Sequence, residues 1–97
     1  MSRKHMDVHR LIRQLSLPER RWVLLDHWDG DQLAIGIAAA SNRRRLVYVS
    51  IDPAQPDRYN YICEVPNGPE PTEFEHGRSD DNVSYDDLVA ALEEHLT

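Results

Sequence analysis

Three apolar segments of strand length follow one another in the first half of the chain and limit its fold more than any other feature. They cover residues 22–28 (WVLLDHW), 33–39 (LAIGIAA) and 46–51 (LVYVSI). The Asp29-Gly30 pair between the first two is typical of a tight hairpin turn, and the polar residues 41–44 separate the second from the third. Successive strands joined by short turns pair antiparallel, so this region is predicted to form a meandering antiparallel sheet.

A fourth strand and two flanking helices complete the predicted fold. Residues 59–65 alternate in strand fashion until Pro66 ends the pattern. Apolar stripes with helical spacing precede Pro18 and follow Ser84, which stands where a helix N-cap is expected. The sequence therefore predicts a single α+β domain over residues 1–97, with a four-stranded antiparallel meander sheet and an N-terminal and a C-terminal helix. The expected elements are a helix at 5–17, strands at 21–28, 33–40, 45–52 and 59–65, an acidic loop at 66–82 and a helix at 84–96.

The second strand has small residues at every other position, namely Ala34, Gly36, Ala38 and Ala40. Small side chains on one face of a strand indicate close packing by another element, and we expect a helix there. Both faces of the predicted sheet nevertheless carry apolar residues. Two helices on one face would leave the other partly exposed, or covered by a partner.

Charge is distributed unevenly along the chain. The net charge is −6, but residues 1–50 hold nine basic and five acidic residues, whereas residues 51–97 hold two basic and twelve acidic ones. An acidic surface of this kind disfavours nucleic acid and anionic membranes as partners and favours a basic protein. The alternative interpretation is that these acidic residues only keep the protein soluble and mark no partner.

Cysteine content and hydropathy bear on the compartment. A lone cysteine, Cys63, allows no intramolecular disulfide and no cysteine-based zinc site, and it fits a reducing environment. No apolar run approaches the ~20 residues that span a membrane, and the amphipathic segment after residue 5 is unlike a signal peptide. We therefore expect a cytoplasmic protein.

The sequence contains no recognisable catalytic motif. Its densest group of polar residues is the predicted hairpin 26–31 (DHWDGD), where three carboxylates and His27 could hold a divalent cation. The pattern lacks the glycine and glutamate of a calcium loop at the required offsets, so a polar hairpin is the simpler interpretation. Cys63 lies neither in a nucleophile elbow nor in a sequence motif of a known cysteine enzyme. We expect no catalytic residue, no metal site and no cofactor, and hence no enzyme.

A binding surface is the remaining interpretation. Trp22 is expected in the core, whereas Trp28 at the hairpin end, surrounded by aspartates, has the composition of a protein-recognition hot spot. Tyrosines on neighbouring strands and acids of the loop would extend this surface. The candidate partner-binding residues are Asp26, Trp28, Asp29, Asp31, Tyr48, Tyr61, Glu73, Glu75, Asp80 and Asp81.

The strand segments also carry a resemblance to known proteins. The runs WVLLDHWD (22–29), AIGIA (34–38), LVYVS (46–50) and YNY (59–61) are similar to those of small bacterial immunity proteins of contact-dependent growth inhibition and other polymorphic toxin systems. The resemblance covers the sheet, but not the acidic loop. It implies a small acidic cytoplasmic antitoxin that binds one cognate toxin, often a basic nuclease, and covers its active site.

The expected function is thus that of an immunity protein, a monomer or weak dimer when free, with a toxin as partner and neither nucleic acid nor membrane. Two alternatives from other classes stay open. One is a small metal-binding enzyme that uses the Asp26–Asp31 hairpin, and the other is a regulatory or structural adaptor subunit.

Overall fold

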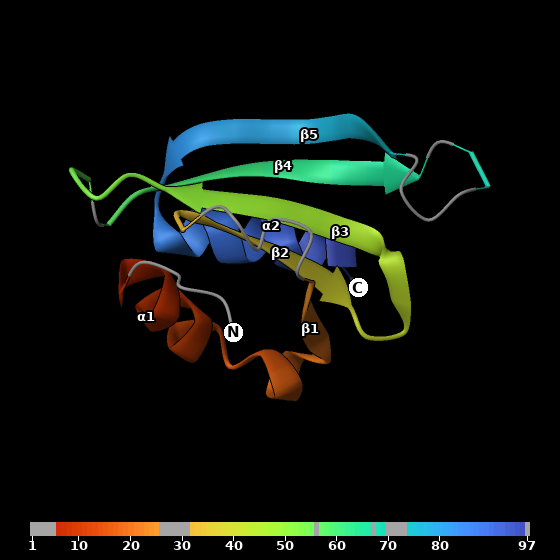
Figure 1. Cartoon of the computed structure of the whole chain (residues 1–97), viewed down its shortest axis with the longest axis horizontal. Helices are drawn as coiled ribbons and strands as arrows, with labels where there is room; N and C mark the ends of the chain where they lie inside the picture. Colours follow the sequence, from red (N-terminus) through yellow and green to blue (C-terminus); the bar gives the residue numbers. More distant parts are fainter. Residues whose placement is uncertain (1–5, 26–31, 56, 67, 70–73, 97) are drawn as a thin grey trace.

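The computed structural model describes residues 6–25, 32–55, 57–66, 68–69 and 74–96. It has an α+β fold with two α-helices and a five-stranded antiparallel sheet, whose strands lie side by side in chain order (Figure 1). The elements are α1 (Met6–Leu15), a 3₁₀ helix η1 (Leu17–Arg20), β1 (Trp22–Leu25), β2 (Ala34–Ala39), β3 (Asn42–Ile51), β4 (Tyr59–Pro66), β5 (Phe74–Val83) and α2 (Tyr85–Leu96). The α+β class and the meander are confirmed, but the sheet has five strands and not four.

The core lies between one face of the sheet and both helices. Ile37, Val47 and Cys63 lie opposite one another across β2, β3 and β4, and all three are buried. The buried residues of the helical segments join the same cluster: Val8, Leu11, Leu15, Leu17, Leu88, Ala91, Leu92 and Leu96. Because the two helices share one cluster with the same strand positions, they cover the same face. None of the described helices is long and apolar enough to cross a membrane.

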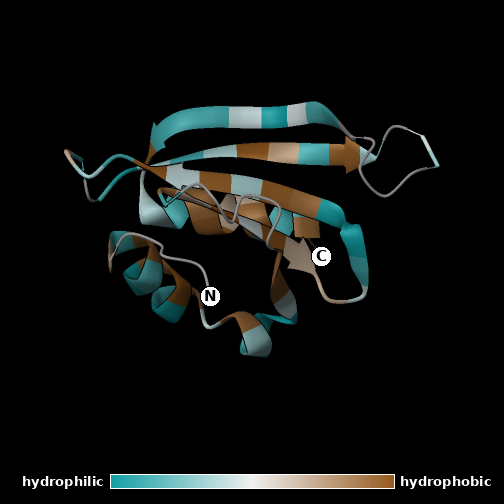
Figure 2. Ribbon diagram, viewed as in Figure 1, coloured by the Kyte–Doolittle hydropathy of each residue, from teal (hydrophilic) through white to brown (hydrophobic). Residues whose placement is uncertain are grey.

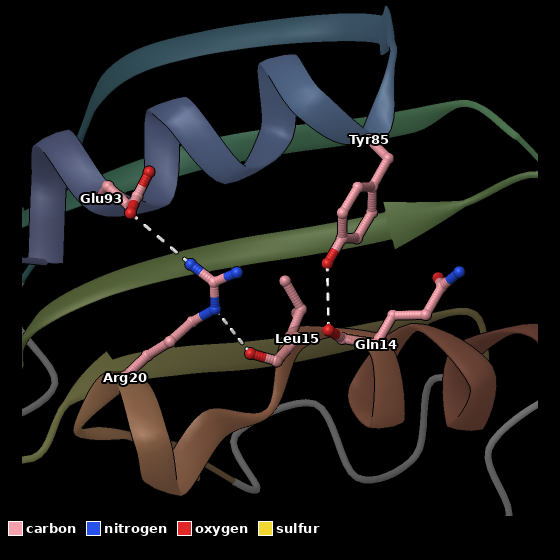
Figure 3. A network of polar contacts seen from close by, with 5 residues as sticks. All are labelled: Gln14, Leu15, Arg20, Tyr85 and Glu93. Atoms are coloured by element: carbon pink, nitrogen blue, oxygen red, sulfur yellow. Dashed lines mark hydrogen bonds and ion pairs between the residues drawn. The ribbon is translucent and has the colours of Figure 1, made fainter.

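Polar contacts join the N-terminal helical segment to α2 (Figure 3). The Tyr85 hydroxyl donates to the Gln14 carbonyl at 3.1 Å. Arg20 donates from Nε to the Leu15 carbonyl at 2.7 Å and places Nη1 3.6 Å from a Glu93 carboxylate oxygen. Arg20 thus satisfies a carbonyl at the end of α1, which has no partner within the helix.

The expectation of a helix on the small-residue face of β2 is wrong. The helices pack on the opposite face, where Ile35 and Ile37 offer more apolar area. On the small-residue face, Gly36 lies opposite Tyr48 and Ala38 lies opposite Leu46 on β3. Larger side chains on the neighbouring strand therefore stand beside the small ones.

The prediction of an acidic loop over residues 66–82 is also wrong for most of that range. Residues from 74 onward form β5, which pairs antiparallel with β4 along its length and has two register shifts. Figure 2 shows that β5 is much more hydrophilic than β4. Val83 at its end lies opposite Tyr59 at the start of β4. The chain must therefore run back along β4 before α2 can begin, and pairing satisfies its backbone on the way.

The other boundaries differ little from the expected ones. β3 begins at Asn42, so part of the expected turn at 41–44 is strand, with a bulge opposite Ala38 and Ala39. α1 ends at Leu15, before Ser16 adopts a left-handed conformation (φ 49°). The predicted N-cap is confirmed, because the Asp87 N–H donates to the Ser84 hydroxyl at 3.2 Å. The expected last residues of the first strand, 26–28, lie outside the described part of the chain.

Gly77 marks a close approach of β5 to β4 and provides a test of the fifth strand. A Cβ at this position would lie 2.9 Å from Val65 Cγ2 and 3.2 Å from the Cys63 carbonyl oxygen. We expect Gly77→Ala to lower the free energy of unfolding by about 1–3 kcal/mol, the usual cost of overpacking, as measured by urea denaturation. Ser79→Ala, at an exposed position of the same strand, is the control and should change stability little. Equal stability of the two variants would contradict the close packing of β5 on β4.

Candidate functional site

The predicted hairpin site cannot be placed. Asp26, Trp28, Asp29 and Asp31, together with Glu73, lie outside the described residues. Their role in binding stays a prediction, and the other five predicted residues lie in the described part of the chain.

The two predicted tyrosines lie on opposite faces of the sheet. Tyr48 is half-buried and pairs with Ile62, on the face away from the helices. Tyr61 is 2% exposed and belongs to the core under the helices. The assignment of Tyr61 to a partner-binding surface is therefore corrected: its strand position points it to the face that the helices cover.

Three of the predicted acids lie on one edge of the sheet. Glu75, Asp80 and Asp81 are exposed residues of β5, whose sole strand neighbour among the described strands is β4. All residues from 75 to 82 are exposed. The edge of β5 that faces away from β4 therefore presents both carboxylates and backbone groups.

The C-terminal end of β5 gathers further carboxylates. Asn82 adopts a left-handed conformation (φ 56°), and its N–H donates to Asn60 Oδ1 on β4 at 2.9 Å. This bend leads into α2, whose first turn exposes Asp86 and Asp87. We call the exposed acids of this end, Asp80, Asp81, Asp86 and Asp87, the acidic corner.

Among the described residues, local backbone structure and not an ion pair surrounds the carboxylates of the acidic corner. The Asp81 N–H donates to Asp80 Oδ1 at 2.9 Å, and the N-terminus of α2 favours negative charge in its first turn. The ion pairs formed within the described part of the chain use other acids, Asp7, Glu64, Glu93 and Glu94. The acidic corner thus remains available to a basic partner.

The middle of β5 is tied to the body of the protein. Arg78 Nη1 lies 2.6 Å from a Glu94 carboxylate oxygen on α2, and His76 Nε2 lies 3.6 Å from Glu64 Oε1 on β4. The second pair is charged when His76 is protonated. One contact lies on each face of the sheet, and together they join the edge strand to α2 and to β4.

Cys63, a free cysteine, is a candidate nucleophile with a perturbed environment. It is 3% exposed, and burial raises the pKa of its thiol above the ordinary value. A hollow of about 160 Å³ beside it is lined by Cys63, Val65, Arg78, Ala91, Glu94 and His95. His95 Nε2 lies 3.1 Å from the Glu64 carbonyl oxygen. A protonated, buried thiol is a poor nucleophile, so this hollow has the character of core packing.

Comparison of the chain with protein-family models, curated proteins and solved structures finds no match. Among the described residues, no group of three or more His, Cys, Asp or Glu side chains is placed to hold a metal ion. What these residues do form is an exposed acidic edge whose backbone is paired with β4, and such an arrangement can bind a cationic surface.

Because the Cys63 thiol is buried, the stability of the protein is expected to change with pH in the alkaline range. Burial raises the pKa of Cys63 above 9.0, and burial likewise raises the pKa of Tyr59 above 10.0. The unfolded chain then loses these protons at lower pH than the folded chain, so the stabilisation is complete below the unfolded pKa values and is lost as pH rises through them. We expect the free energy of unfolding, measured by urea denaturation, to fall as pH rises above about 9, near the unfolded thiol pKa.

Cys63→Ala removes the first of these two groups. It should lower stability at every pH through its cavity, but flatten the decline near pH 9. The same slope in Cys63→Ala and in the unsubstituted chain would contradict the role of the thiol.

Proposed function

We propose that this protein is an antitoxin-type immunity protein that binds a basic toxin domain, a nuclease by preference, and covers its active site. The observation that carries the proposal is the exposed acidic edge formed by β5 and the acidic corner. It joins three of the acids expected from the sequence, Glu75, Asp80 and Asp81, to two at the start of α2. The resemblance of the strand segments to immunity proteins supports the same conclusion.

Charge is the physical basis of the proposed recognition. A nuclease cleft is lined by cations that bind phosphates, so carboxylates on a rigid edge would replace the phosphates there. Long-range attraction between opposite surfaces raises association rates by roughly 10–10³-fold and weakens with salt. The acids of the β5 edge are exposed, which keeps the desolvation cost of holding them in the free protein small.

The backbone of β5 adds rigidity to this charged surface. Its pairing with β4 and the ion pair of Arg78 with Glu94 hold the strand in place before any partner arrives. A surface formed in advance loses less conformational entropy on binding than a mobile acidic loop does. The edge strand is therefore better suited to tight inhibition than the loop expected from the sequence.

The first test concerns the gene neighbourhood and growth. The proposal requires a protein with a toxic C-terminal domain to be encoded next to this gene, and expression of that domain alone should stop growth. Co-expression of the present protein should restore growth and form a one-to-one complex on size-exclusion chromatography. A toxic neighbour that binds the protein without losing activity would contradict inhibition.

Neutralising the acidic edge tests which surface binds. We expect the triple variant Glu75→Gln, Asp80→Asn, Asp81→Asn to associate with the toxin domain about tenfold more slowly at low salt. The difference should shrink above ~0.5 M salt, where charges are screened within a few ångströms. Association rates from stopped-flow or surface plasmon resonance measure both effects.

A matched control changes the net charge by the same amount at other exposed positions. The triple variant Gln14→Lys, Gln32→Lys, Gln55→Lys serves this purpose, because all three glutamines are exposed and lie outside β5. Its association should slow much less than that of the edge variant. Equal slowing would show that total charge, and not the β5 edge, governs the encounter.

A further inference from the structure

The opposite edge of the sheet carries a second feature, an apolar groove beside β1. One hollow of about 460 Å³ lies between α1, η1 and β1 and is lined by Ile12, Arg13, Ser16, Leu17, Pro18, Trp22, Val23 and Leu24. An adjoining hollow of about 640 Å³ shares Pro18, Trp22 and Val23 and adds Arg21, Ala40 and Ser41. We call these two hollows, which share lining residues on β1, the β1 groove.

The exposed apolar surface here is unusual for this molecule. Leu24 is 40% exposed and Met6 is 74% exposed, whereas the other large aliphatic side chains of the described residues are buried or half-buried. Trp22, two residues before Leu24 on the same strand, lines both hollows and is 3% exposed. A leucine that stands beside an apolar hollow marks a place where a partner gains burial.

The backbone of β1 also has an open side. β2 is its sole strand neighbour in the described sheet. The Ala40 N–H donates to the Arg21 carbonyl at 2.9 Å, so this carbonyl faces β2, whereas the Arg21 N–H donates to the Pro18 carbonyl. In an antiparallel ladder this direction alternates, and the backbone groups of Trp22 and Leu24 therefore face away from β2. An added strand would find donors and acceptors there.

The charges around the groove select among possible occupants. The charged residues that line it are Arg13 and Arg21, both exposed, and no acid lines either hollow. A second copy docked symmetrically on this edge would bring the arginines of the two copies together, which repulsion opposes. An apolar segment flanked by carboxylates would instead pair with them.

We propose that the β1 groove binds an extended apolar peptide segment with acidic flanking residues, supplied by another protein, as an additional strand on β1. Its backbone pairs with Trp22 and Leu24, its apolar side chain enters the hollow beside Leu24, and its carboxylates pair with Arg13 and Arg21. This surface lies on the edge opposite β5, and the proposal does not depend on the immunity function.

Two synthetic peptides test the proposal directly. The first is acetyl-Glu-Val-Leu-Val-Glu-amide, and the second has lysine in place of both glutamates. We expect saturable binding of the first by isothermal titration calorimetry, with backbone amide shifts at Trp22–Leu25 in NMR spectra, and at least tenfold weaker binding of the second. Equal affinities of the two peptides, or no binding of the first at millimolar concentration, would overturn the proposal.

A third peptide separates strand addition from simple apolar contact. N-methylation of the three central residues of the glutamate peptide removes their backbone donors and keeps the side chains. This peptide should bind at least tenfold more weakly, because it cannot pair with β1. Unchanged affinity would overturn strand addition. Because only the peptide is changed, the test uses the unsubstituted protein and cannot be confused by a variant that fails to fold.

Protein variants locate the site. Leu24→Asp and the double variant Arg13→Gln, Arg21→Asn should each weaken binding of the glutamate peptide at least fivefold, and the double variant should lose most of the salt dependence. Arg43→Gln, an exposed arginine outside the groove, is the control and should bind normally. Circular dichroism confirms that each variant is folded.

Sedimentation equilibrium tests whether a second copy of the chain, and not a peptide of another protein, occupies the β1 groove. The unsubstituted chain should be a monomer at the concentrations used for calorimetry. A dimer that Leu24→Asp dissociates would show that a second copy occupies the groove and would overturn the proposal.

Discussion

The fold depends on one packing contact, between the helix pair and the branched side chains of β2 and β3. Ile35, Ile37, Val47 and Val49 are at most 4% exposed and belong to the cluster that the helices complete. Each such side chain contributes roughly 1.5–3 kcal/mol when fully buried. Since the two helices are also tied to each other by Tyr85 and Arg20 (Figure 3), they occupy one face together, and the described helices leave the other face to the strands themselves.

The elements that pack into this core are those that the sequence predicts well. The stripe of Val8, Leu11 and Leu15 and the alternation in β2, β3 and β4 indicate burial, because most buried positions are apolar. The choice of face was not predictable in the same way. Small residues in β2 suggested close helix packing, but a small residue can equally lie beside a large one on the next strand, as Gly36 does beside Tyr48. Residue size along one strand cannot distinguish these cases.

β5 escaped prediction for a different reason. Its residues from 75 to 82 are all exposed, so no apolar periodicity marks it, and it is held by backbone pairing, by Gly77 against Val65 and by ion pairs. One signal was present: an expected loop of this length is uncommon in a compact domain, and that argues for hidden structure. The placement of Tyr61 follows from the same alternation that placed Cys63 in the core, and strand phase alone could have assigned it. The predicted hairpin at 26–31 lies outside the described residues, so its role in binding stays a prediction.

The two edges of the sheet differ in chemistry, and this difference bears on whether copies of the chain can pair edge to edge. β5 is acidic and β1 is flanked by Arg13 and Arg21, so charge alone would favour pairing of the β5 edge of one copy with the β1 edge of the next. Such head-to-tail contacts do not close and lead to filaments. Geometry opposes them, because β5 has two register shifts and a left-handed residue at Asn82, and the described part of β1, Trp22–Leu25, is four residues long. Bulges and short strands are common protections of sheet edges. A partner for either edge must then supply what a second copy lacks: a broad cationic surface for β5, or a short, regular strand for β1.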